Sequence, residues 1–148
     1  MKEKTIASLR KNGREKLTSL SKSLHTDVDN IHKLIKEEDG KLIKKFTALI
    51  DFAQLGYPIR VMMVMAVSSK EKARIASFLR KHQNVNSLFL INNGYDFFIE
   101  MIFKSIKDVH NFTENIESKY TIYDKKEYYI LDALFEENFM SNPRLIPC

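Results

Sequence analysis

The spacing of apolar residues in the first third of the chain predicts three short helices. Ile6 and Leu9 belong to a first helix that ends at Asn12-Gly13, because these two residue types favour the backbone conformation that closes a helix. In the next two segments an apolar residue recurs every three or four positions, as in a helix with one buried face. The residues concerned are Leu17, Leu20 and Leu24 in the second helix, and Val28, Ile31, Leu34 and Ile35 in the third. Asp27 can cap the third helix, and Gly40 stops it.

The next segment, "KLIKKFTALID" from Lys41 to Asp51, predicts a strand or a two-strand ribbon. It is rich in β-branched and aromatic residues, which fit a pleated surface. Two short helices joined by a tight turn and followed by a ribbon describe a winged helix-turn-helix. We therefore predict a first domain over residues 1–52, with a hinge at 53–57.

The pattern changes after "QLGYP", residues 54–58, where glycine and proline interrupt the chain. Four segments then have the length and apolar content of strands, and two have the periodicity of helices. The strands are expected near 59–69, 87–91, 96–103 and 128–134, and the helices at 70–82 and 107–120. The order βαββαβ is that of a ferredoxin-like domain, with four antiparallel strands and two helices on one face. The fold class is thus α+β, with a second domain over residues 58–148.

The positive charge of the chain is concentrated in its first third. The 148 residues carry a net charge of +5, and residues 1–50 hold 12 Lys and Arg against 7 Asp and Glu, whereas residues 51–148 hold 12 of each kind. A basic segment joined to a neutral remainder suggests a part that binds a polyanion and a part with another task. The alternative is a basic, solvated face that has no partner.

Several classes of function find no support in the sequence. No apolar run approaches the roughly 20 residues of a membrane span, and the N-terminus lacks the apolar region of a signal peptide, so we expect a cytoplasmic protein with no membrane partner. The single cysteine, Cys148, excludes an internal disulfide. The four histidines lack the spacing of a metal site, and no nucleotide-binding or nucleophile motif is present. The methionines at 62, 63 and 65 are best read as packing residues. We therefore expect no catalytic residue, metal or cofactor.

A polar pentad, "NNGYD" from Asn92 to Asp96, separates two apolar runs. Asn-Gly is a strong hairpin signal, because both residues tolerate a positive φ. Turn chemistry explains Tyr95 and Asp96 less well. Either Asp96 caps the hairpin while Tyr95 packs at an oligomer contact, or the two side chains hold a ligand.

Four segments in order resemble the Lrp/AsnC family of feast/famine transcriptional regulators. They are "NGREKLTSLSKSL" (12–24), "IKKFTALID" (43–51), "LGYP" (55–58) and "NNGYDFFIE" (92–100). The resemblance implies a winged helix-turn-helix that binds double-stranded DNA, joined to a ferredoxin-like domain that forms homodimers or larger homo-oligomers. It also implies an amino acid or similar effector at the pentad. The effector site would comprise Asn93, Gly94, Tyr95 and Asp96, with Asp96 facing the effector's ammonium group.

The third predicted helix, within "DVDNIHKLIKEEDG" (27–40), departs from the family pattern. Where the family has several basic residues, this chain has His32, Lys33 and Leu34, and acidic residues surround them. Carboxylates repel phosphates, which predicts weak or unusual reading of DNA sequence. The remaining basic side chains would hold phosphates, while polar residues of the third helix reach base edges. The predicted DNA-binding residues are Arg14, Lys22, Lys44 and Lys45 for the backbone, and Asn30, His32 and Lys33 for the bases.

Two alternatives to a DNA-binding regulator stay open. One is a small-molecule sensor or assembly module whose helix-turn-helix is retained as a scaffold. The other is an enzyme like the sirohaem decarboxylases, which resemble Lrp/AsnC proteins, although their aromatic- and histidine-rich pocket motifs are not found here. The run "IRVMMVMAV" is apolar on both alternating sets, which predicts a dimer built through the second domain's sheet. The last ten residues, 139–148, match no part of the pattern.

Overall fold

A computed structural model describes residues 1–146, so Cys148 lies outside the described residues. The chain divides into two compact units. Unit 1 comprises residues 1–49 together with the C-terminal segment that begins at Ala133, and unit 2 comprises residues 50–132. None of the helices in the described residues has the length and apolar content needed to cross a membrane.

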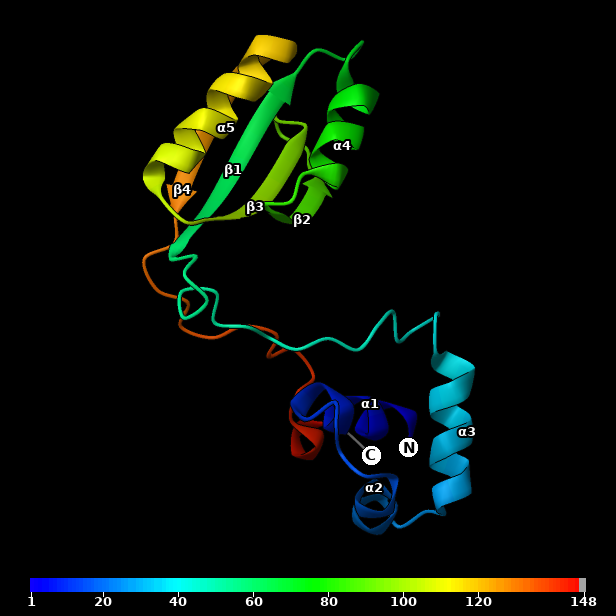
Figure 1. The fold of residues 1–148 in the computed structure, drawn as a ribbon. Helices are drawn as coiled ribbons and strands as arrows, with labels where there is room; N and C mark the ends of the chain where they lie inside the picture. The colour runs from blue at the N-terminus through cyan, green and yellow to red at the C-terminus, as the bar shows by residue number, and fades with distance from the viewer. Residues whose placement is uncertain (147–148) are drawn as a thin grey trace. The chain divides into compact units, whose positions relative to one another are not determined.

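Unit 1 contains the three predicted helices, α1 (Lys2–Lys11), α2 (Leu17–Leu24) and α3 (Val28–Glu38) (Figure 1). Their small core includes the fully buried side chains of Ala7, Leu20 and Ile31, one from each helix. His25 ends α2 in the left-handed conformation with a φ of 51°, which turns the chain toward α3. Asp27 is the N-cap of α3 as predicted, but its side chain makes no capping hydrogen bond.

The predicted wing is wrong. After α3 the chain closes a tight turn in which Gly40, with a φ of 72°, donates its N–H to the Ile43 carbonyl at 2.9 Å. One isolated bridge, Asp39 to Ile43, is the nearest approach to a ribbon, and the described residues 44–58 form no strand. The apolar side chains of this segment, including Leu42, Phe46 and Leu49, are exposed. A two-stranded ribbon is marginally stable without a surface to pack against, and within the described residues these side chains stay more than half exposed.

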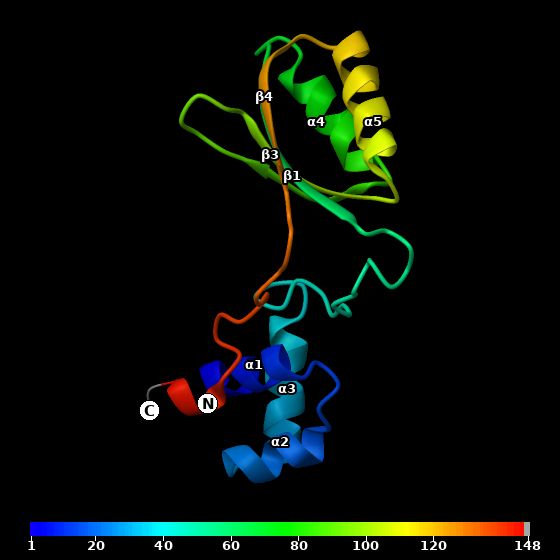
Figure 2. The same ribbon diagram turned by 90° about the vertical axis from the view of Figure 1, so that its left-hand side faces the viewer.

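Unit 2 has the predicted order βαββαβ. Its elements are β1 (Ile59–Val67), α4 (Lys72–Lys81), β2 (Val85–Leu90), β3 (Phe97–Phe103), α5 (Ile106–Lys119) and β4 (Ile122–Tyr129). The sheet order is β2-β3-β1-β4, and every neighbouring pair is antiparallel. Figures 1 and 2 show α4 and α5 on the same face of this sheet. The ferredoxin-like prediction is confirmed.

The core of unit 2 lies between that face of the sheet and the two helices. Alternate residues of β1, from Val61 to Val67, point inward and are buried. They pack with Ile75 and Leu79 of α4 and with Val109, Phe112 and Ile116 of α5. Met63 and Met65 are fully buried in this core, which confirms their reading as packing residues.

The last strand lies upstream of its predicted position. The sequence indicated residues 128–134, whereas β4 ends at Tyr129 and the chain is irregular beyond it. The strand escaped detection because charged residues occupy its inner face. Lys125 Nζ lies 3.0 Å from Glu117 Oε1 of α5, and Thr113 Oγ1 donates to Glu127 Oε1 at 3.3 Å. These pairs replace the apolar alternation that identifies most strands.

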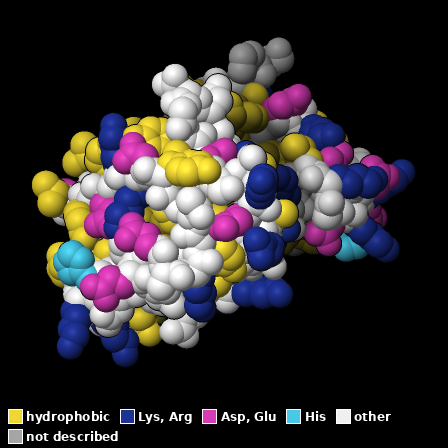
Figure 3. Space-filling view, turned by 90° about the horizontal axis from the view of Figure 1, so that it is seen from above, with side chains coloured by type: hydrophobic (Ala, Val, Ile, Leu, Met, Phe, Trp, Pro, Cys, Tyr) yellow, Lys and Arg dark blue, Asp and Glu magenta, His cyan; other side chains and the backbone are white. Residues whose placement is uncertain are grey.

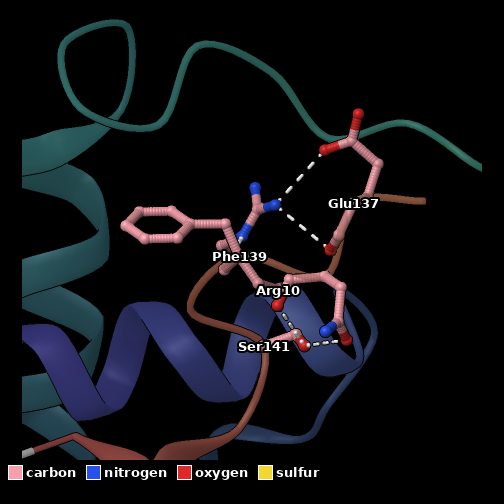
Figure 4. Close-up of polar contacts among 5 residues, drawn as sticks. Arg10, Glu137, Phe139 and Ser141 are labelled. Carbon is pink, nitrogen blue, oxygen red and sulfur yellow. Dashed lines mark hydrogen bonds and ion pairs between the residues drawn. The ribbon is translucent and has the colours of Figure 1, made fainter. Parts of the chain in front are cut away.

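The C-terminal segment belongs to unit 1, so the predicted second domain, residues 58–148, extended too far. Figure 4 shows how Arg10 of α1 holds this segment. The Arg10 Nε–H donates to the Phe139 carbonyl at 2.5 Å, and its terminal N–H group donates to the Glu137 carbonyl at 3.1 Å and to Glu137 Oε2 at 3.2 Å. The segment then forms a short 3-10 helix, η1 (Pro143–Leu145), which contacts α1. One guanidinium thus satisfies two carbonyls of a segment with little regular structure.

Arg10→Gln should release the C-terminal segment from α1. The variant loses hydrogen bonds whose combined net worth at this half-exposed position is about 1 kcal/mol, equivalent to roughly fivefold faster amide exchange in residues 137–141. Hydrogen exchange followed by mass spectrometry measures this, with Lys11→Gln, an exposed neighbour, as the control. Equal exchange in the two variants would contradict the assignment.

Candidate nucleic-acid interface and effector hairpin

The predicted DNA-binding residues are all exposed in unit 1. Arg14 lies in the turn between α1 and α2, and Lys22 on α2. Asn30 and Lys33 are three residues apart on the solvent face of α3, with His32 beside them. Lys44 and Lys45 lie in the irregular segment after α3. Burial of Ile31 against the other helices fixes which face of α3 is turned outward.

Ion pairs within unit 1 offset part of the acidic charge of α3. Lys2 of α1 pairs with Glu38 at the end of α3, and Lys33 Nζ lies 4.0 Å from Glu37 Oε1 one turn away. Asp27 and Asp29 stand at the N-terminal end of the helix, where negative charge is favoured. The repulsion between α3 and a phosphate backbone is therefore smaller than the count of carboxylates suggests.

One basic side chain of unit 1 is unavailable to a polyanion. Arg10 is committed to Glu137 and Phe139 of the C-terminal segment, and no local pattern predicts a contact between residues so far apart in the chain. Over the face drawn in Figure 3, Lys and Arg side chains lie among Asp and Glu side chains. On that face the basic side chains do not form one continuous patch.

The pentad of unit 2 forms the predicted hairpin between β2 and β3. Asn93 and Gly94 have φ values of 67° and 91°, the left-handed pair that tight hairpin turns require. Ile91 donates its N–H to the Asp96 carbonyl at 3.0 Å and closes the loop.

The two pentad side chains that turn chemistry left unexplained bind other parts of unit 2. The Asp96 carboxylate accepts hydrogen bonds from the Val67 N–H at 2.8 Å and from Lys72 Nζ at 3.1 Å. The hydrogen bond from Val67, followed by Lys72, lowers the pKa of Asp96. The Tyr95 hydroxyl donates to Asp124 Oδ2 at 2.8 Å. Asp96 thereby ties the hairpin to the end of β1 and the start of α4, and Tyr95 ties it to β4.

The sheet face opposite α4 and α5 is a further candidate interface. Met62, Val64 and Phe98 lie on it half-buried, and Phe89 is 54% exposed. Within this face Glu100 is 5% exposed and accepts a hydrogen bond from Arg60 Nε at 2.8 Å. Asn86 and Ser87 of β2 also donate to this carboxylate. Lys126 and Asp124 of β4 pair with Val64 and Ala66 on the same face, at its β4 side. A largely apolar patch with charged residues beside it is typical of a surface that another protein surface covers.

Sequence comparison relates the chain to helix-turn-helix regulators of archaea. It is 28% identical to the HTH-type transcriptional regulator FL11 of Pyrococcus horikoshii over 117 aligned residues. The alignment covers 78% of each chain. It is 23% identical over 142 residues to an uncharacterized HTH-type transcriptional regulator of Pyrococcus abyssi, covering 95% of this chain and 96% of that one. No family model matches the chain.

Structural comparison gives the fold family. A transcriptional regulator from Neisseria meningitidis, in complex with L-Met, superposes with a TM-score of 0.82 at 18% identity over 91% of this chain and 90% of that one. E. coli AsnC gives a TM-score of 0.80 at 18% identity, covering 91% and 93% of the two chains. B. subtilis LrpC gives 0.79 at 17% identity, covering 88% and 92%. The chain thus combines a helix-turn-helix with a ferredoxin-like domain. This fold, together with the HTH-type relatives, supports the predicted resemblance to Lrp/AsnC regulators.

Asp96→Asn should destabilise unit 2 at neutral pH by about 1 kcal/mol, because the charge-assisted bond from Lys72 is lost. The folded-state pKa of Asp96 is lowered from its ordinary value of 3.8, so its carboxylate stabilises the fold above that value and the stabilisation disappears as the pH falls through the folded-state pKa. The difference in melting temperature between wild type and variant should therefore shrink from pH 7 toward about pH 2.

The matched control is Asp132→Asn, an exposed carboxylate near the end of unit 2. It should change the melting temperature little at either pH. A wild-type minus Asp96→Asn difference that stays constant across this pH range would rule out the structural role of the carboxylate.

Proposed function

We propose that the chain is a DNA-binding transcriptional regulator in which unit 1 binds double-stranded DNA and unit 2 forms homo-oligomers and responds to an amino acid or similar small effector. The observation that carries this proposal is the helix-turn-helix of unit 1, whose α3 directs Asn30, His32 and Lys33 into solvent. The names of the Pyrococcus relatives support it.

Two groups of side chains would divide the work of binding. Arg14, Lys22, Lys44 and Lys45 would neutralise backbone phosphates, which supplies affinity without reading sequence. Asn30, His32 and Lys33 would enter the major groove, where an asparagine can pair with adenine and a lysine with guanine. Because Lys33 also lies near Glu37, its reach toward a base competes with an ion pair on the helix.

A second candidate function is a sensor or assembly module whose helix-turn-helix serves as a scaffold. The acidic residues on α3, Asp29 and Glu37 among them, favour it. The two functions differ in how the protein binds random duplex DNA in a salt series. A regulator loses affinity steeply as salt rises, and a scaffold shows no measurable binding at low salt.

The effector response is proposed from the fold that the chain shares with a regulator solved as an L-Met complex. In the predicted site, the backbone around Asn93 and Gly94 would hold the effector's carboxylate. Tyr95 and Asp96 are already bound within unit 2, so an effector ammonium group would have to compete with Lys72 for the carboxylate.

The uncovered sheet face is proposed as the dimer interface. Each half-buried apolar side chain on it gains about 1 kcal/mol or more when a second copy removes it from water. The Arg60 and Glu100 pair would restrict the register of the two sheets, because misaligned copies would cover this pair with apolar side chains.

Neutralising Lys44 and Lys45 together, as Lys44→Gln/Lys45→Gln, should weaken binding to all duplexes alike. Each lost phosphate contact should flatten the slope of log K against log salt by about one unit. Fluorescence anisotropy with random and with selected duplexes measures this. His32→Ala should instead alter the preference among sequences and leave the salt slope unchanged. Identical salt slopes for wild type and the double variant would remove these lysines from the interface.

Val64→Glu should convert a dimer into monomers, because it places a carboxylate in the middle of the uncovered face. Val64 is half-exposed in the single chain, so the variant should still fold. Sedimentation velocity at micromolar concentration gives the mass, and His110→Glu on the exposed side of α5 provides a control with the same added group. A monomeric wild type, or an unchanged mass for Val64→Glu, would contradict the interface.

A further inference from the structure

Unit 2 contains a cavity of about 780 Å³ where β2 begins and β3 ends. This volume lies within the range of small-molecule sites in proteins. Its walls come from the turn before β1, the start of β2, the end of β3 and one face of α5. The lining residues used below are Phe52, Tyr57, Lys104, Asp108, Asn111 and Asn115.

The cavity is separate from the effector hairpin. The hairpin joins the other ends of β2 and β3, and the seven residues of β3 place it about 20 Å away. No residue of the pentad lines the cavity. A ligand bound here would therefore make contacts independent of those at Asn93 to Asp96.

The interior of the cavity is aromatic. Phe103 and Phe112 line it and are buried, and their ring centroids lie 6.0 Å apart. The His82 ring meets the Phe112 ring edge-on at 4.9 Å. Burial, together with nearby Lys119, lowers the pKa of His82, so this side chain is a neutral hydrogen-bonding group at pH 7. This lining thus suits an apolar or aromatic group.

One ridge of α5 adds polar groups that the protein itself does not use. Asp108, Asn111 and Asn115 follow each other at three and four residues and so share a face of the helix. The side-chain amides of Asn111 and Asn115 make no hydrogen bond within residues 1–146. Asn84, by contrast, donates to the Ile102 carbonyl at 2.7 Å. Two donor and acceptor pairs therefore remain available at the cavity wall.

The cavity also presents one cationic and one anionic side chain. Lys104 precedes the Ser105 N-cap of α5, and Asp108 lies in the first turn of that helix. A carboxylate and an ammonium group on one small ligand would match this pair. We propose that the cavity is a second ligand site of unit 2, one that binds a small zwitterion with an apolar or aromatic side chain, an amino acid or a close analogue.

The turn before β1, at the start of unit 2, forms one wall of this site. Lys104 Nζ lies 5.2 Å from the centre of the Tyr57 ring, and Phe52 lines the same side. Asp51 holds the turn, accepting from the Ala53 N–H at 3.1 Å and from Gln54 Nε2 at 2.9 Å. A bound ligand would add contacts to this turn and favour its ordered form. Any effect of this ligand on DNA affinity rests on the proposed function of unit 1. Binding of the ligand to the cavity does not.

Thermal shift of the full chain against each standard amino acid tests the ligand class. Calorimetry then gives the Kd of the amino acid with the largest shift for four variants. Asn111→Ala/Asn115→Ala replaces two exposed helix residues with the best helix former and should raise the Kd at least about tenfold without loss of folding. Glu114→Ala, on α5 outside the cavity, is the matched control and should change the Kd less than about twofold.

The remaining two variants separate the cavity from the hairpin. Lys104→Gln should weaken binding at the cavity through loss of the carboxylate partner. Asp96→Asn, studied well below its melting temperature, removes the ammonium partner of the hairpin site and should leave in place the binding that depends on Asn111 and Asn115. The proposal is overturned if no amino acid shifts the melting temperature, or if Asp96→Asn abolishes binding while Asn111→Ala/Asn115→Ala retains it. Anisotropy with a random duplex in the absence of amino acid reports on unit 1 alone, so a failure of the site and a failure of DNA binding are told apart.

Discussion

The alternation of side chains along β1 is the constraint on which unit 2 depends. β1 lies between β3 and β4, and its inward residues, Met63 and Met65 among them, form the middle of the core. Burying each such side chain contributes about 1.5 to 3 kcal/mol. The same alternation sends Arg60, Met62 and Val64 to the opposite face, which no helix of unit 2 covers. A strand that is apolar on both sides therefore produces a core and an assembly surface at once.

The ends of this sheet carry distinct chemistry. At one end Asp96 receives the Val67 N–H and Lys72, so its charge is used to hold the hairpin. At the other end Asn111 and Asn115 leave their amides unused beside the aromatic lining of the cavity. Unused polar groups around a cavity are more readily available to a ligand than a carboxylate that already has two partners, because binding breaks no internal bond. This difference is why we place a ligand site at the end of the sheet beside the turn before β1.

The sequence allowed prediction of those elements whose signal is local. The three-and-four spacing of Leu17, Leu20 and Leu24 identified α2, and the order of apolar runs identified the ferredoxin-like topology. The errors arose where partners lie far apart in the chain. β4 lacks the usual apolar alternation because its charged residues pair with α5. The C-terminal segment is held by Arg10, which lies 127 residues before Glu137. The residues predicted as a wing have the composition of a ribbon, but Leu42, Phe46 and Leu49 stay more than half exposed within the described residues.

The central claim is that unit 1 binds duplex DNA through the exposed side chains of its helix-turn-helix and of the segment after α3. Backbone amide NMR spectra of the full, isotope-labelled chain, recorded during titration with a random duplex at low salt, test it most directly. The account predicts that the largest shifts fall between Arg14 and Lys45, including Lys22, Asn30 and Lys33, and that they reverse as salt is raised. Unchanged signals across that range, or shifts concentrated in unit 2, would contradict it.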